Sequence, residues 1–60
     1  MNNYQIRLWA GSKTTTKSGF RDYLIEQSSN IATAMDRAKA KVEKEFGAAE
    51  VEIIYIKKVN

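Results

Sequence analysis

The sequence predicts an α+β protein in which three strands and one helix follow one another in the order ββαβ. Residues 4–10 and 20–27 alternate in side-chain type at every second position, as strands do. Residues 31–46 carry apolar side chains at intervals of three and four, and residues 51–59 are rich in β-branched and aromatic side chains. Because the chain has only 60 residues, we expect one domain, residues 1–60, with a single thin core.

The first predicted strand covers residues 4–10 and leads into a long hairpin. Residues 11–19 contain no apolar side chain and have a glycine at each end, which is typical of a solvated hairpin tip. The second strand is then predicted over residues 20–27, with Phe20 and Leu24 on the opposite face from Tyr23. The first strand has one apolar and one mixed side, namely Tyr4, Ile6, Leu8 and Ala10 against Gln5, Arg7 and Trp9.

The helix is predicted from about residue 30 to residue 46. Ser28, Ser29 and Asn30 are all good N-cap residues, and Gly47 lies where a left-handed residue would end the helix. Its apolar stripe, which should face the sheet, consists of Ile31, Ala34, Met35, Ala38, Val42 and Phe46.

The third predicted strand, residues 51–59, is apolar on both sides, since regular alternation sets Val51, Ile53, Tyr55 and Val59 against Ile54 and Ile56. Because the hairpin reverses the chain and the helix returns it, this strand should run antiparallel to the first strand and pair beside it. The favoured strand order is therefore 2-1-3, in a mostly antiparallel sheet with a right-handed crossover. Order 1-2-3 with a parallel pair is the alternative.

One helix covers one face of such a sheet, so the second face should be open. Trp9 and Arg7 are expected on it, together with one side of each neighbouring strand, and an apolar patch of this kind usually marks a binding surface. The alternative is that the long hairpin folds over these side chains and completes the small core. The candidate partner-binding residues are Trp9, Arg7, Tyr55, Ile53 and Arg21.

The formal net charge of +3 has its basic surplus in the first third of the chain, where four basic residues and no acidic residue occur up to position 21. Lys13 and Lys17 are candidate phosphate contacts. Gly11 and Lys17-Ser18 have the spacing of a GxxxxGK[ST] nucleotide-binding loop, but Thr16 replaces its second glycine and a strand follows instead of a helix. We therefore expect no nucleotide hydrolysis.

Catalytic and metal-binding residue types are sparse. The chain has no His and no Cys, which removes the usual general base and the usual zinc ligands. Asp22 and Glu26 would lie about 13 Å apart along one strand, too far to act as a pair. Glu43 and Glu45 lie beside lysines on the outer face of the predicted helix, where solvated ion pairs are the ordinary explanation. We expect a protein that is not an enzyme and needs no cofactor and no metal.

These observations predict a small binding protein that acts through protein–protein interaction, as a regulator, inhibitor or accessory factor of the kind carried by phages and other mobile elements. We expect it to form a homodimer through its sheet. The alternative is a small nucleic-acid-binding module, with bases stacked on the aromatic sheet face and phosphates held by the basic hairpin. No small-molecule substrate is inferred.

The expected localisation is cytoplasmic. The chain lacks cysteine, has no signal-peptide pattern and has no apolar run of the ~20 residues that span a bilayer, so no membrane partner is expected. The order of elements, with Phe46-Gly47 ending the helix before Val51-Glu52-Ile53, is similar to that of the small ribosomal LX proteins. This resemblance covers mostly the last thirty residues and implies no assignment of functional residues.

Overall fold

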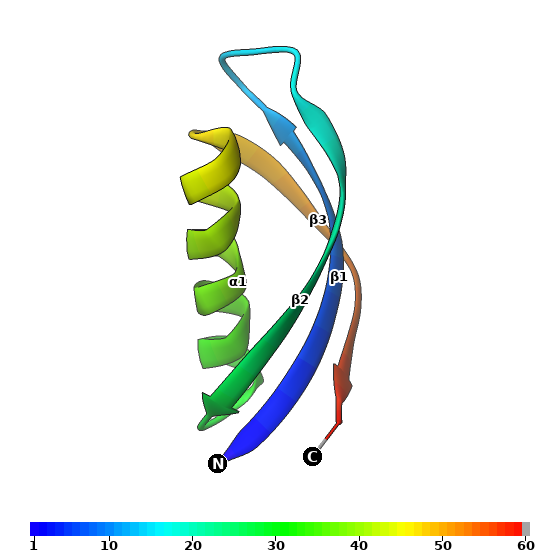
Figure 1. The fold of residues 1–60 in the computed structure, drawn as a ribbon, viewed down its shortest axis with the longest axis vertical. Coiled ribbons are helices and arrows are strands. Elements are labelled where there is room, and N and C mark those ends of the chain that lie inside the picture. The colour runs from blue at the N-terminus through cyan, green and yellow to red at the C-terminus, as the bar shows by residue number, and fades with distance from the viewer. Residues whose placement is uncertain (60) are drawn as a thin grey trace.

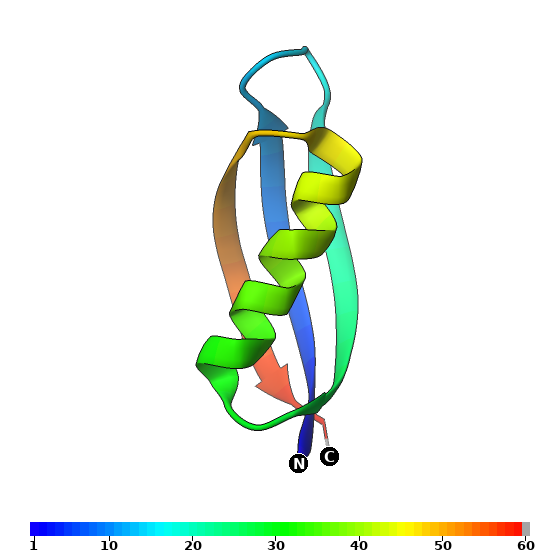
Figure 2. The ribbon, with the colours of Figure 1, turned by 90° about the vertical axis from the view of Figure 1, so that its left-hand side faces the viewer.

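The computed structural model describes residues 1–59 and contains four elements in the predicted order (Figure 1). The three strands form one antiparallel sheet with the order β2-β1-β3, which confirms the favoured topology over the parallel alternative. The helix lies obliquely across one face of this sheet (Figure 2). The elements are β1 (Asn2–Ser12), β2 (Ser18–Ser28), α1 (Ile31–Phe46) and β3 (Ala49–Lys58).

The β1–β2 hairpin is longer than the sequence pattern indicated, because backbone pairing continues through polar residues at both strand ends. Its tip is closed by the Ser12 hydroxyl, which accepts hydrogen bonds from the backbone N–H groups of Thr14 (3.2 Å) and Thr15 (3.1 Å). The backbone N–H of Lys13 donates to the carbonyl oxygen of Ala48 at 2.8 Å. This bond holds the tip beside the α1–β3 connection, on the helix side of the sheet.

Helix α1 begins and ends at the residues that its sequence predicts. The Asn30 side chain accepts a hydrogen bond from the Thr33 N–H at 2.8 Å, which satisfies one of the free donors of the first turn. Gly47 has a φ of 74° and its N–H donates to Glu43 O, although its ψ of −147° differs from the left-handed helical value. Within residues 1–59, no helix is long and apolar enough to cross a membrane.

The core lies between α1 and the central strand. Ala34 and Ala38 are fully buried, and their small side chains allow the helix to approach β1 closely. Ile31 does not join the core, because it is 51% exposed on a first turn that reaches beyond β3 (Figure 2). The buried apolar residues are Tyr4, Ile6, Leu8, Ala10, Ile25, Ala34, Ala38, Val42 and Phe46.

A β-bulge in β3 changes which side chains face the helix. Arg7 pairs with Tyr55 but Leu8 pairs with Ile53, so Ile54 is an extra residue in β3. Ile53 and Ile56 therefore both pack against the core, whereas Ile54 and Tyr55 are 49% and 42% exposed. The expectation that Ile53 and Tyr55 share a face is wrong, because one inserted residue reverses the alternation of a strand.

A second irregularity lies at the other end of the sheet. Asn2 pairs with Ser28 and Tyr4 pairs with Ile25, so β2 contains one more residue than β1 between these pairs. Gln27 has a φ of 55°, and its backbone N–H donates to the Asn3 side-chain oxygen at 2.9 Å. Gln27 is consequently exposed, while Ser28 is buried just before the helix begins. The alternation expected for β2 therefore holds as far as Ile25.

Deletion of Ile54 should be tolerated, because it removes the extra residue and leaves Ile53 and Ile56 in register with β1. We expect a loss of less than about 1 kcal/mol, which lowers the melting temperature by at most about 4–8 °C. Deletion of Arg7, at the same level of the central strand, is the control and should unfold the protein, because it turns half of the core side chains of β1 outward. Circular dichroism melts measure both effects. Equal destabilisation by the two deletions would contradict the bulge assignment.

Candidate interaction surface

The face of the sheet that turns away from α1 is uncovered in the described structure (Figure 1). We call it the open face. Its central residues are Gln5, Arg7 and Trp9, which alternate along β1 with the fully or nearly buried residues of the core. The strand register places beside them Phe20, Asp22 and Leu24 of β2, and Glu52, Tyr55 and Lys57 of β3, with the bulge residue Ile54 next to Tyr55.

Large apolar side chains are exposed on this face from one edge strand to the other. The exposed fractions are 57% for Phe20, 51% for Leu24, 49% for Ile54 and 42% for Tyr55. The hairpin does not cover them, because its tip is bonded to the α1–β3 connection on the opposite side. The expected open face is therefore present, and the alternative of a hairpin folded over it is not observed.

Arg7 lies at the centre of the open face, and its charge is paired within the chain. Its Nη1 atom is 3.6 Å from Oδ2 of Asp22 on the neighbouring strand, with both side chains 45% exposed. Its guanidinium carbon lies 5.8 Å from the centroid of the Phe20 ring. Arg7 therefore presents a hydrogen-bonding group that already has an acidic partner.

Trp9 lies against the backbone of Gly11. A Cβ atom placed on Gly11 would be 2.5 Å from the Cη2 atom of the indole, so the ring occupies space that any other residue at position 11 would fill. Trp9 is half-buried and is paired across the strands with Phe20. These contacts hold a broad aromatic surface in one place, which is the property of residues that dominate binding interfaces.

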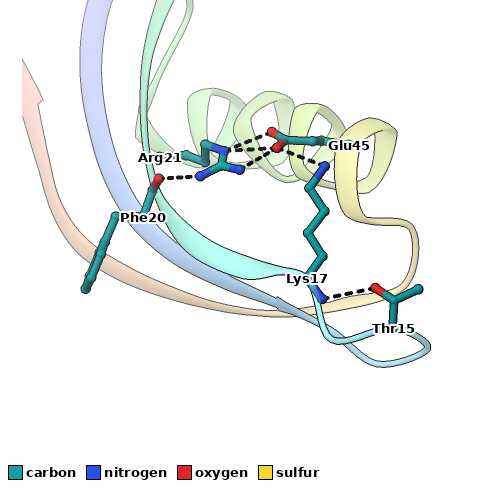
Figure 3. A network of polar contacts seen from close by, with 5 residues as sticks. All are labelled: Thr15, Lys17, Phe20, Arg21 and Glu45. Atoms are coloured by element: carbon teal, nitrogen blue, oxygen red, sulfur yellow. Dashed lines mark hydrogen bonds and ion pairs between the residues drawn. The ribbon is translucent and has the colours of Figure 1, made fainter.

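On the helix side, Arg21 and Lys17 share one acidic partner, Glu45, near the end of α1 (Figure 3). The Arg21 Nε donates to Glu45 Oε1 at 3.0 Å, and the Lys17 Nζ lies 3.3 Å from Oε2. Both cations also lie over the Phe46 ring, with distances to its centroid of 5.0 Å for Arg21 and 5.3 Å for Lys17. This cluster attaches the hairpin to the helix.

The pKa values of two side chains in and beside this cluster are shifted. Hydrogen bonds from Arg21, with a further contribution from Lys17, lower the pKa of Glu45 from 4.5 to about 2. Burial raises the pKa of the neighbouring Tyr23, whose hydroxyl is buried and has no hydrogen-bond partner within residues 1–59. The sequence predicted that Glu45 pairs with neighbouring lysines on the helix surface. Its actual partners, Arg21 and Lys17, come from a strand and a loop at least 24 positions away.

The structure brings three of the five candidate binding residues together, because Trp9, Arg7 and Tyr55 all lie on the open face. The other two lie on the opposite side of the sheet, since Ile53 packs against the core and Arg21 is bonded to Glu45. Four further residues of the open face, Phe20, Leu24, Glu52 and Lys57, are not among the candidates predicted from the sequence. The alternation of β2 already placed Phe20 and Leu24 on one face, whereas the positions of Glu52 and Lys57 depend on the strand register.

The basic surplus of the first third of the chain is partly neutralised in the fold. Three of its four cations, Arg7, Lys17 and Arg21, form ion pairs with two acids from later parts of the chain, since Lys17 and Arg21 share Glu45. Lys17, one of the two candidate phosphate contacts, is therefore bonded to a carboxylate. Lys13, the other, is exposed on the hairpin tip and forms no ion pair among the described residues.

A groove lies between α1 and β3. It is lined by Lys39, Val42, Glu43, Ala49 and Val51. This lining contains one carboxylate and one amine, and it lacks a pair of acids or a nucleophile with an adjacent base. Within residues 1–59 there is no cluster of three or more His, Cys, Asp or Glu side chains that could hold a metal ion. The open face is therefore the best candidate site.

Substitution of Gly11 by alanine should displace the Trp9 ring from the sheet. We expect a red shift of the tryptophan emission, because the indole becomes more exposed. Trp9 is the only tryptophan, so the emission reports this site alone. Ser18→Ala, at the β2 position that pairs with Gly11, is the control and should leave the emission unchanged. An unshifted spectrum in Gly11→Ala would contradict the proposed contact.

The Glu45 cluster should make stability depend on pH in the acid range. Since the pKa of Glu45 is lower in the folded protein than its ordinary 4.5, its contribution is present above pH 4.5 and is lost as the pH falls towards about 2. Glu45→Gln should be less stable than the wild type at pH 6, and the difference should vanish near pH 2. Urea titrations across this range measure it. Glu43→Gln, a control that removes no ion pair within residues 1–59, should keep a constant offset; a constant offset for Glu45→Gln would contradict the prediction.

Comparison with known proteins identifies no relative. No protein-family model matches the chain, and no curated protein or solved structure shows significant similarity to it. None of these comparisons supports the resemblance of the element order to the small ribosomal LX proteins.

Proposed function

We propose that this chain is a non-catalytic binding protein that recognises another protein surface through its open face. The observation that carries this proposal is the group of four large apolar side chains, 42–57% exposed, that lie together on the one sheet face without a helix. A sheet face that exposes several large apolar side chains is typical of interaction sites. Trp9, Arg7 and Tyr55 belong to the residue types that are enriched where binding energy is concentrated.

The charge of the open face supports a protein partner over a nucleic acid. Arg7 and Lys57 are balanced on this face by Asp22 and Glu52, so these four side chains carry no net charge. Nucleic-acid binding draws its affinity mainly from cations that neutralise phosphates. The basic hairpin adds little, because Lys17 already has an acidic partner. A flat, largely apolar protein surface of balanced charge is the better complement.

Such a protein would act as a regulator, inhibitor or accessory factor, according to what its partner does. The lack of cysteine is compatible with a reducing compartment, and we propose the cytoplasm as the place of the interaction.

The test is to capture partners with the immobilised chain from nuclease-treated extract, to identify them by mass spectrometry, and to titrate each purified partner against the chain. Phe20→Ser and Leu24→Ser should each weaken that purified interaction about tenfold or more, as expected for anchor residues worth about 1–2 kcal/mol. Ile31→Ser is the matched control, because Ile31 is equally exposed but lies on α1, and it should leave the affinity unchanged.

Two outcomes would count against the proposal. Equal weakening by Ile31→Ser and by the open-face variants would show that the open face is not the site. Binding that disappears after nuclease treatment, with an affinity that falls steeply with salt concentration, would indicate the nucleic-acid alternative. Thermal melts of each variant separate a loss of binding from a loss of folding.

A further inference from the structure

The side chains of the open face form three rows across the strands, and the strand register defines each row. The middle row contains Arg7, flanked by Asp22 and Tyr55. Successive rows on one face of a sheet are about 7 Å apart, since two residues separate them. The outer rows are Leu24, Gln5 and Lys57 on one side and Phe20, Trp9 and Glu52 on the other.

We propose that the partner surface on the open face is that of a second copy of this chain, packed face to face with its strands reversed. This inference rests on the proposed function and names its partner. The reversal corresponds to a twofold axis that runs across the strands through the middle row. The Leu24, Gln5 and Lys57 row of each copy then faces the Phe20, Trp9 and Glu52 row of the other copy.

In the outer rows, the reversed arrangement pairs apolar groups on β2 with apolar groups and opposite charges on β3 with each other. Leu24 of one copy faces Phe20 of the other, both on β2, and Lys57 faces Glu52, both on β3. Twofold symmetry produces each of these contacts twice. Trp9 faces Gln5, whose amide oxygen can accept a hydrogen bond from the indole N–H.

The middle row also suits this arrangement. Ile54 and Tyr55 meet their own symmetry copies and form an apolar centre on β3. Arg7 and Asp22 also meet their own symmetry copies, so like charges face each other across the axis. Each of these charges keeps the opposite charge of its own chain as a partner at 3.6 Å, which offsets the repulsion within the group of four. The interface therefore has no unpartnered charge near its centre, where an unpaired charge would be costly.

Other face-to-face arrangements are less favourable. A twofold axis along the strands sets β2 against β3, and it places Phe20 over Glu52 and Leu24 over Lys57. A reversal about an axis between the middle row and the Phe20, Trp9 and Glu52 row places Glu52 over Tyr55. Both remove a charge from water without providing an opposite charge. All of these arrangements keep the strand directions of the two sheets nearly aligned, as in one common class of sheet packing, so the facing side chains are what distinguish them.

The size of the chain adds a reason for association. A domain of about 60 residues buries only about 60% of the surface of its unfolded chain, and small folds of this kind often complete their cores by oligomerisation. A second copy on the open face would give the sheet a cover on both sides.

The experiment exchanges the charges that the two copies present to each other. Glu52→Lys and Lys57→Glu should each weaken the dimer about tenfold or more, because each substitution turns two attractions into repulsions. The double variant should return to the wild-type dissociation constant. An equimolar mixture of the two single variants should form a heterodimer of wild-type affinity, because one chain then carries lysine at both positions and faces glutamate at both positions of the other. Analytical ultracentrifugation measures each dissociation constant.

Two charge reversals in the same strand serve as controls. Glu50→Lys changes an exposed residue of the same face that lies one row beyond the facing pairs. Lys58→Glu changes an exposed residue that is paired with Tyr4, at a core-facing level of β1. Both controls should change the dissociation constant less than about twofold, since neither side chain faces a charge in the reversed dimer.

A mass of 6.8 kDa for the wild type up to millimolar concentration would overturn the inference. A wild-type dimer whose single variants stay weak when mixed would overturn the reversed arrangement. If the chain is monomeric but a purified partner still loses affinity with Phe20→Ser and Leu24→Ser, the inference fails and the proposed function remains. If neither a second copy nor a purified partner depends on these residues, both fail.

Discussion

The contact between α1 and the central strand β1 is the interaction on which the rest of this structure depends. Ala34 and Ala38 are fully buried against a strand whose inward residues include the fully buried Ile6 and Leu8. Close packing of one helix on the middle of a three-stranded sheet brings all three strands into one core. Because the chain has a single helix, the same contact that builds the core leaves the opposite face without a cover.

Several local features position the elements around this contact. The Glu45 cluster attaches the hairpin to the last turn of the helix, and the Lys13 N–H bond attaches the hairpin tip to the α1–β3 connection. Both act on the helix side, so the long hairpin is held away from the open face. The cations that could have made the hairpin a phosphate-binding element serve in part as structural contacts of the fold. The open face consequently keeps its apolar character and a balanced charge.

The two faces of the sheet also differ because of one residue in β3. The bulge at Ile54 allows Ile53 and Ile56 to pack inward together, which a regular strand does not permit for residues three positions apart. It also exposes Ile54 and Tyr55 side by side. In β3, Ile53 and Ile56 thus belong to the core, and the residues between them belong to the open face. This explains why the strand lacks the regular alternation of a half-exposed strand.

The sequence by itself determined the element order and the helix ends at Asn30 and Gly47, and it favoured the strand order 2-1-3 and an open face with Trp9 and Arg7 over the alternatives that the structure then excluded. These features follow from local periodicity, capping residues and the number of helices, all of which can be read along the chain. Only the tertiary structure decided that Ile53 faces the core, that Arg21 and Lys17 bind Glu45, and that Trp9 lies on Gly11. Each of these depends on strand register or on a contact between distant segments. A single inserted residue reverses the faces of a strand, and an ion pair depends on which distant segments lie close together in the fold. Periodicity along the chain contains neither kind of information.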